Sequence, residues 1–101
     1  MTSILYIEID VHIINDTLDR TGALLVDVRE ADEFAAGHIP GAVNAPLSVL
    51  SNTPLPQDRP LFLYCLRGTR SRRAAGILKR MGCASAKSIG GISGYKGSLE
   101  R

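Results

Sequence analysis

The stretch "PLFLYCLRGTRSRRAAGILKRMG", residues 60–82, carries the pattern that decides the fold. It opens with a continuous apolar run, residues 60–64, of the kind found in strands that are buried on both faces of a parallel sheet. A short glycine-containing connection, "LRGT", then leads to a segment with the apolar period of a helix, residues 71–82. We therefore expect a buried strand, a tight turn and a helix that begins near Ser71.

The same alternation of apolar runs and helix-period segments continues on both sides of this stretch. Further strands are expected at residues 5–9, 23–28, 42–43 and 86–89. Helices are expected at residues 11–20, with Asp10 as the N-cap, and at residues 30–36, with at most a short helix between residues 47 and 60 and one closing helical turn after residue 91. Strands alternating with helices predict an α/β fold in three layers, with a short parallel sheet of about five strands and helices on both faces. Residues 1–101 are expected to form a single domain.

The overall composition excludes several classes of protein. Of the 101 residues 45% are apolar and 22% charged, which is ordinary for a globular domain, and the net charge is +2. That charge is too small to predict a nucleic-acid partner, and the apolar runs are too short to cross a bilayer. The N-terminal segment "MTSILYIEID" has no export signal, so we expect a cytoplasmic protein without a membrane partner.

The chain has two cysteines, Cys65 and Cys83. They form no CxxC pair and no cluster with histidine at zinc spacing, so neither a metal site nor a disulfide framework is expected. Cys83 lies between a glycine and an alanine in a predicted helix-to-strand turn, which favours a packing role. Resolution of an oxidised Cys65 by Cys83 is also unfavourable, because a helix of about eleven residues, some 16 Å long, separates the two.

Cys65 has the surroundings of a reactive thiolate. It follows a buried strand, where ligands of parallel sheets bind, and a turn at Gly68 can direct backbone N–H groups toward its sulfur. The positive end of the next helix and the charges of Arg67 and Arg70 add to this effect. All three effects favour thiolate over thiol, and the same groups would hold an oxyanion beside the sulfur. The pattern predicts a nucleophilic cysteine that attacks an anionic substrate.

Charged residues also follow the strand at residues 23–28. Asp27 and Arg29 could support the site, but a salt bridge that braces the loop is the better interpretation, since charged residues at strand ends commonly pair. Glu33 is expected on the helix surface or in the same brace. For His38, in a turn, we expect a hydrogen bond to the backbone in preference to general-base catalysis.

Three motifs in this order resemble the single-domain rhodanese family: "LLVDVREADEFAAGHIPGAVNAP", "YCLRGTRS" and "SIGGISGYKG". The resemblance covers nearly the whole chain and implies sulfurtransfer without a cofactor. A sulfur would pass from a small anionic donor such as thiosulfate to cyanide, a small thiol or a protein thiol. Cys65 would carry the persulfide, and the anion cradle would consist of Leu66, Arg67, Gly68, Thr69 and Arg70.

The sequence departs from the family at two places and leaves two other functions open. Leu66 stands where family members that act on thiosulfate often have arginine, and Tyr95 stands where a tryptophan is usual. A cysteine phosphatase or arsenate reductase also uses a cradled thiolate, but its Cys-x5-Arg loop would need arginine at the position of Ser71. A non-catalytic docking module is the remaining alternative, although inactive rhodanese-like domains generally lack the cysteine that this chain keeps.

Overall fold

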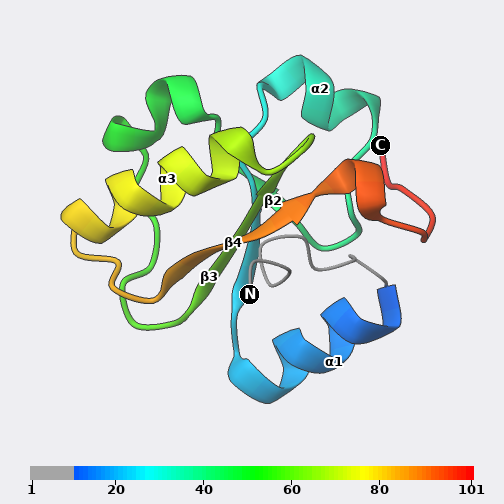
Figure 1. The fold of residues 1–101 in the computed structure, drawn as a ribbon, viewed down its shortest axis with the longest axis horizontal. Coiled ribbons are helices and arrows are strands. Elements are labelled where there is room, and N and C mark those ends of the chain that lie inside the picture. Colours follow the sequence, from blue (N-terminus) through cyan, green and yellow to red (C-terminus); the bar gives the residue numbers. More distant parts are fainter. Residues whose placement is uncertain (1–10) are drawn as a thin grey trace.

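The protein is described by a computed structural model over residues 11–101. Four parallel strands form one sheet in the order β2-β1-β3-β4 (Figure 1). The strand predicted at residues 5–9 lies outside the described residues. The elements in chain order are α1 Val11–Thr21, β1 Leu24–Asp27, α2 Ala31–Ala36, β2 Val43–Asn44, the 3-10 helix η2 Leu47–Asn52, β3 Leu61–Cys65, α3 Thr69–Arg80, β4 Ala86–Gly91 and the 3-10 turn η3 Ile92–Gly94.

The two faces of the sheet carry two separate hydrophobic clusters. Side chains alternate along β3, so Leu63 and Cys65 face α3 and η2, whereas Tyr64 faces α1. Figure 1 shows α1 against one face of the sheet, with α3 and η2 over the other, which confirms the prediction of helices on both faces. Within residues 11–101, no helix combines the length and the apolar character needed to cross a membrane.

Two element boundaries near Cys65 differ from the expected ones. Cys65 is the last residue of β3 and not the first residue after it, and α3 begins at Thr69, two residues earlier than expected. The helix begins early because Gly68 has a positive φ of 100°, which reverses the chain in a single step. β4 extends through Gly91, which pairs with Cys65. Gly90 and Gly91, the closing glycines, therefore lie directly beside the turn that follows Cys65.

Candidate active site

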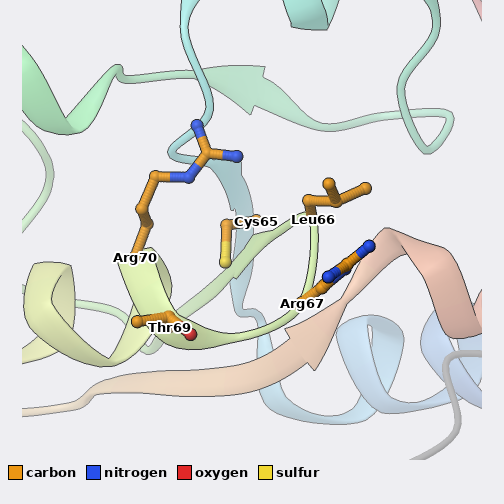
Figure 2. Close-up of a pocket in the computed structure, with 5 residues that line it drawn as sticks. All are labelled: Cys65, Leu66, Arg67, Thr69 and Arg70. Atoms are coloured by element: carbon orange, nitrogen blue, oxygen red, sulfur yellow. The ribbon is translucent and has the colours of Figure 1, made fainter.

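The Cys65 sulfur lies inside a tight curl of the chain. The side chain is 1% exposed, and Figure 2 shows its sulfur pointing into the loop that connects β3 to α3. The backbone N–H of Gly68 donates to Sγ at 3.0 Å and that of Ser71 at 3.4 Å, while the Ser71 Oγ lies 3.6 Å away. These are the inward-pointing N–H groups that the sequence predicts.

The geometry of the helix start explains why a sulfur fits here. Gly68 is the N-cap of α3, and Ser71 is the third residue of the helix. N–H groups in the first turn have no acceptor within their own helix, so the Ser71 N–H is available to the sulfur. The positive end of the helix dipole lies at the same place. Cys65 thus accepts hydrogen bonds that the helix start would otherwise leave unmade.

These contacts alter the acidity of the thiol. Burial acts to raise the pKa of Cys65, but the bonds from the Ser71 backbone and hydroxyl, together with the N–H groups of Gly68 and Arg67, outweigh it and lower the pKa below its usual value. A buried thiol surrounded by apolar groups alone would shift the other way. The site therefore favours thiolate, mainly through neutral hydrogen-bond donors.

Ser71 is a site residue that the sequence analysis did not identify. Its side chain is fully buried, and its Oγ lies 3.1 Å from the Gly68 carbonyl oxygen, 3.4 Å from that of Gly90 and 2.7 Å from the Ser88 Oγ. The available signal was its position six residues after Cys65 in the first turn of a helix, where a small hydroxyl can reach the turn.

The two arginines of the loop differ from one another. Arg67 is exposed, and its side chain points away from the sulfur in Figure 2. Arg70 donates from Nη1 and Nη2 to the two carboxylate oxygens of Glu33, at 2.7 and 3.1 Å. The bond to Glu33 is the main cause that raises the pKa of Arg70, and the nearby Cys65 contributes. The cation expected beside the sulfur therefore shares its charge with a carboxylate.

Glu33 pairs with the active-site loop and does not lie free on the helix surface. Besides Arg70, it accepts a hydrogen bond from the Glu30 backbone N–H at 3.0 Å, at the start of α2. The Arg70 side-chain bond, followed by the Glu30 N–H bond, lowers the pKa of Glu33 to about 2. Glu33 thus ties α2 to the first turn of α3 and does not belong to the brace formed by Asp27 and Arg29.

A pocket of about 210 Å³ opens over the sulfur. Its lining consists of predicted loop residues, and Gly68, the remaining member of the predicted cradle, is buried and bonded to Sγ. Leu66 is 40% exposed, so one wall is apolar where an arginine would be charged. The lining residues are Cys65, Leu66, Arg67, Thr69 and Arg70.

The closing glycines of β4 support the loop from the side. A Cβ at Gly91 would overlap the Leu66 carbonyl oxygen and lie 2.6 Å from the Cα of Arg67. The Ser93 backbone N–H then donates to the Leu66 oxygen at 3.2 Å. The absence of a side chain at Gly91 therefore lets β4 approach the turn around Cys65 closely.

Asp27 and Arg29 form the predicted salt bridge at the end of β1. Arg29 Nη2 lies 2.7 Å from Asp27 Oδ2, and the same nitrogen donates to the Gly37 carbonyl oxygen at 2.7 Å. Asp27 is completely buried and Arg29 is 7% exposed. Through these contacts Arg29 ties the end of β1 to Gly37, the residue after α2. This is the bracing role that the sequence favours.

The remaining histidine and cysteine occupy the expected environments. The His38 Nδ1 lies 2.9 Å from the Phe34 carbonyl oxygen, and the two rings stack with centroids 3.7 Å apart. Cys83 is a buried free thiol in the cluster beneath α3, beyond the end of the helix that lies farthest from Cys65. Both residues have the structural contacts that the sequence favours.

Comparison with known proteins agrees with this geometry. A family model described as "Rhodanese-like domain" matches residues 10–98. The uncharacterized protein YqhL of Bacillus subtilis is 42% identical over 81 residues, which cover 77% of this chain and 64% of YqhL, so the chain spans less than two thirds of that relative. The human thiosulfate:glutathione sulfurtransferase is 32% identical over 95 residues, covering 78% of this chain and 81% of its own. A solved structure of a rhodanese-like domain protein from Staphylococcus aureus matches with a TM-score of 0.76 at 26% identity, covering 91% of this chain and 94% of that one. The chain therefore belongs to the rhodanese-like sulfurtransferase family.

Proposed function

We propose that this protein moves a sulfane sulfur from an anionic donor, such as thiosulfate, to a thiophilic acceptor through a persulfide on Cys65. The observation that carries the proposal is the sulfur in its curl, with the N–H groups of Gly68 and Ser71 at 3.0 and 3.4 Å. Donors in this arrangement stabilise negative charge on the sulfur and on an atom bonded to it. The name of the human relative makes thiosulfate the first donor to test.

In the first half-reaction the Cys65 thiolate attacks the outer sulfur of thiosulfate. A bond forms between Sγ and that sulfur, the sulfur–sulfur bond of thiosulfate breaks, and its electron pair leaves with sulfite. The negative charge of the resulting persulfide lies on its terminal sulfur, where the N–H groups of the loop and the positive end of α3 stabilise it.

In the second half-reaction an acceptor attacks the terminal sulfur. Cyanide forms a carbon–sulfur bond and leaves as thiocyanate, while the electron pair of the broken sulfur–sulfur bond returns to Cys65 as thiolate. A small-molecule or protein thiol would take the same sulfur as a persulfide. Because the enzyme is modified between the two steps, ping-pong kinetics are expected. The scheme requires no cofactor.

The charged side chains of the loop are assigned to attraction of the donor. Arg67 lies exposed in the pocket wall, and the charge of Arg70 is shared with Glu33. Replacing either arginine by alanine is expected to raise the KM for thiosulfate about three- to tenfold, as for charges at the rim of a binding site. An unchanged KM in both variants would remove these side chains from donor binding.

The test is the intact mass of the protein after incubation with thiosulfate and again after addition of cyanide. We expect the gain of one sulfur atom, which cyanide then removes as thiocyanate. Cys65→Ala should gain no sulfur, whereas Cys83→Ser should behave as the wild type. Absence of the added sulfur on the wild type would contradict the proposal for thiosulfate, and assays with aryl phosphate and arsenate would then separate the phosphatase-like chemistry from a docking module.

A further inference from the structure

Two serine hydroxyls lie one behind the other beside the Cys65 sulfur. Ser71 Oγ, on α3, is 3.6 Å from Sγ, and Ser88 Oγ, on β4, is 2.7 Å from Ser71 Oγ. Ser71 is fully buried and Ser88 half-buried. The contact between the two hydroxyls is the shortest polar contact of the Ser71 side chain. Ser88 has no part in the sulfur transfer proposed above.

The protons of this group of hydroxyls restrict how it can be arranged. A serine hydroxyl has one proton to donate and lone pairs to accept. When Cys65 is a thiol, its S–H can donate to Ser71 Oγ, and the Ser71 proton can go to the carbonyl oxygen of Gly68 at 3.1 Å or Gly90 at 3.4 Å. When the thiol proton has left to solvent, Sγ can only accept, so in any hydrogen bond between the two groups the Ser71 O–H must be the donor.

When the Ser71 hydroxyl turns toward the sulfur, the Gly68 carbonyl oxygen still has a hydrogen-bond donor. The Gly68 carbonyl oxygen also accepts the backbone N–H of Arg72 at 3.1 Å, the first hydrogen bond of α3. It therefore retains a partner when the Ser71 hydroxyl turns away, and no penalty arises for an unpaired buried carbonyl. The Ser71 oxygen, in contrast, then has a free lone pair that only a donor can fill.

We propose that Ser88 is a positioning residue that directs the Ser71 hydroxyl toward the Cys65 sulfur. Donation from Ser88 fills the lone pair of Ser71 Oγ, so the Ser71 proton cannot point back at Ser88 and remains available to the thiolate. A hydroxyl that accepts a hydrogen bond is also a stronger donor, because successive hydrogen bonds polarise one another. The inference rests on the proposed function only in that Cys65 is the nucleophile.

The Glu33–Arg70 pair beside the sulfur stays ionised over the pH range in which a thiol titrates. The pKa of Glu33 is about 2, so its pair with Arg70 is ionised from pH 5 upward. The ring of His38 is directed at the Phe34 carbonyl oxygen and at Glu100, 3.7 Å from its Nε2, and not at the sulfur. Asp27 and Arg29 pair with each other at the end of β1, and Glu30, before α2, accepts a hydrogen bond from Ser48. The remaining charged side chains of the surrounding elements are exposed: Asp32 on α2, Arg67 in the loop, Arg72, Arg73, Lys79 and Arg80 on α3, and Lys87 on β4.

The experiment measures the pH dependence of Cys65 alkylation by iodoacetamide, together with thiolate absorbance at 240 nm. All variants carry Cys83→Ser, so that one thiol reacts. Ser88→Thr and Ser88→Val form the matched pair, because their side chains have nearly the same shape and only threonine retains a hydroxyl. Ser71→Ala removes the direct donor, and Ser85→Ala, at the exposed turn before β4, is the control.

Ser71→Ala is expected to slow alkylation below the thiol pKa about tenfold, as for loss of one hydrogen bond to a charged group. Ser88→Val is expected to slow it about threefold, since it acts through a second hydroxyl, and Ser88→Thr should restore most of the rate. In the Ser71→Ala background, Ser88→Val should have no further effect, and Ser85→Ala should match the parent.

Equal profiles for Ser88→Thr and Ser88→Val would overturn the proposal, as would a full additional effect of Ser88→Val in the Ser71→Ala background. Thermal unfolding of each variant identifies any that fail to fold, and the threonine–valine pair decides the question at equal bulk. Failure of the wild type to gain sulfur from thiosulfate would contradict the proposed function alone, because the alkylation profile does not depend on sulfur transfer.

Discussion

Two neighbouring strands of the sheet, β1 and β3, end in buried polar groups of opposite design. At the end of β1, the carboxylate of Asp27 and the guanidinium of Arg29 neutralise each other at 2.7 Å. At the end of β3, the Cys65 sulfur accepts hydrogen bonds from neutral N–H groups, and the nearby Arg70 is paired with Glu33. In the first group the counter-ion neutralises the charge, whereas the second leaves a sulfur with a lowered pKa facing a pocket.

This difference separates a structural use of burial from a chemical one. A buried ion pair has its attraction satisfied, so removing one partner leaves an uncompensated charge that destabilises the fold. A buried thiolate held by dipoles keeps its nucleophilic lone pairs, and its loss should affect chemistry more than folding. Substitutions at the two strand ends should therefore have opposite effects on stability and activity.

The largest effect on stability is expected at the end of β1. Asp27→Asn leaves the 7% exposed Arg29 guanidinium without its counter-ion and should lower the free energy of unfolding by about 3–5 kcal/mol. Urea unfolding at neutral pH measures it. The matched control is Asp16→Asn, because the Asp16–Arg20 pair has a similar distance of 3.0 Å but side chains that are 66% and 70% exposed. A change below about 1 kcal/mol is expected for that surface pair.

The activity of the folded Asp27→Asn protein tests the other half of the comparison. At a temperature where the variant is folded, it should still gain sulfur from thiosulfate, because the hydrogen bonds to Sγ come from the loop and from Ser71. A folded variant that gains no sulfur, or one as stable as Asp16→Asn, would contradict the bracing role. In that case the pair would belong to the active site.

The features that sequence predicts here are local ones. The buried run before Cys65, the glycine in the turn and the helix after it are neighbours in the chain, so their types and order indicate the strand, the curl and the thiolate. The salt bridge of Asp27 and Arg29 is equally local, since the two residues are separated by one position. The start of α3 at Thr69, which differs from the expected one by two residues, also has a local cause, the positive φ of Gly68.

The features that sequence could not predict depend on packing between distant segments. Arg70 meets Glu33 across 37 positions of the chain, and Ser71 meets Ser88 across 17. Both contacts depend on how α3 lies against α2 and β4, which no pattern of residue types specifies. The sequence therefore predicts two unpaired cations beside the sulfur, although Arg70 is paired with Glu33. It does not predict that the Ser71 hydroxyl lies beside the sulfur.

An intermediate effect on stability is expected for Gly91→Ala, because Gly91 on β4 contacts the loop that follows Cys65. Its Cβ would overlap the Leu66 carbonyl oxygen, so β4 and the loop would have to separate, at a cost of about 1–3 kcal/mol in stability. Because the N–H groups around Sγ move with the loop, alkylation of Cys65 should also slow. Gly94→Ala is the control, since nothing lies within 4 Å of its added Cβ and its cost should stay within about 0.5 kcal/mol. Equal effects of the two substitutions would show that the loop is not held by this contact.

The smallest effect on stability is expected at Glu33. Its side chain is about a third exposed, so solvent screens its charge. The pKa of Glu33 is lowered to about 2, chiefly by the Arg70 bond, so the carboxylate stabilises the fold fully above its usual pKa of 4.5 and loses this contribution as the pH falls toward 2. Glu33→Gln should thus cost about 1 kcal/mol or less at pH 6, and the difference from the wild type should shrink at pH 3. Urea unfolding at the two pH values measures it, with Asp32→Asn as the exposed control in the same turn of α2. A difference that grows on acidification would show that Arg70 does not hold Glu33 ionised, and the cation beside Cys65 would then be free for the donor.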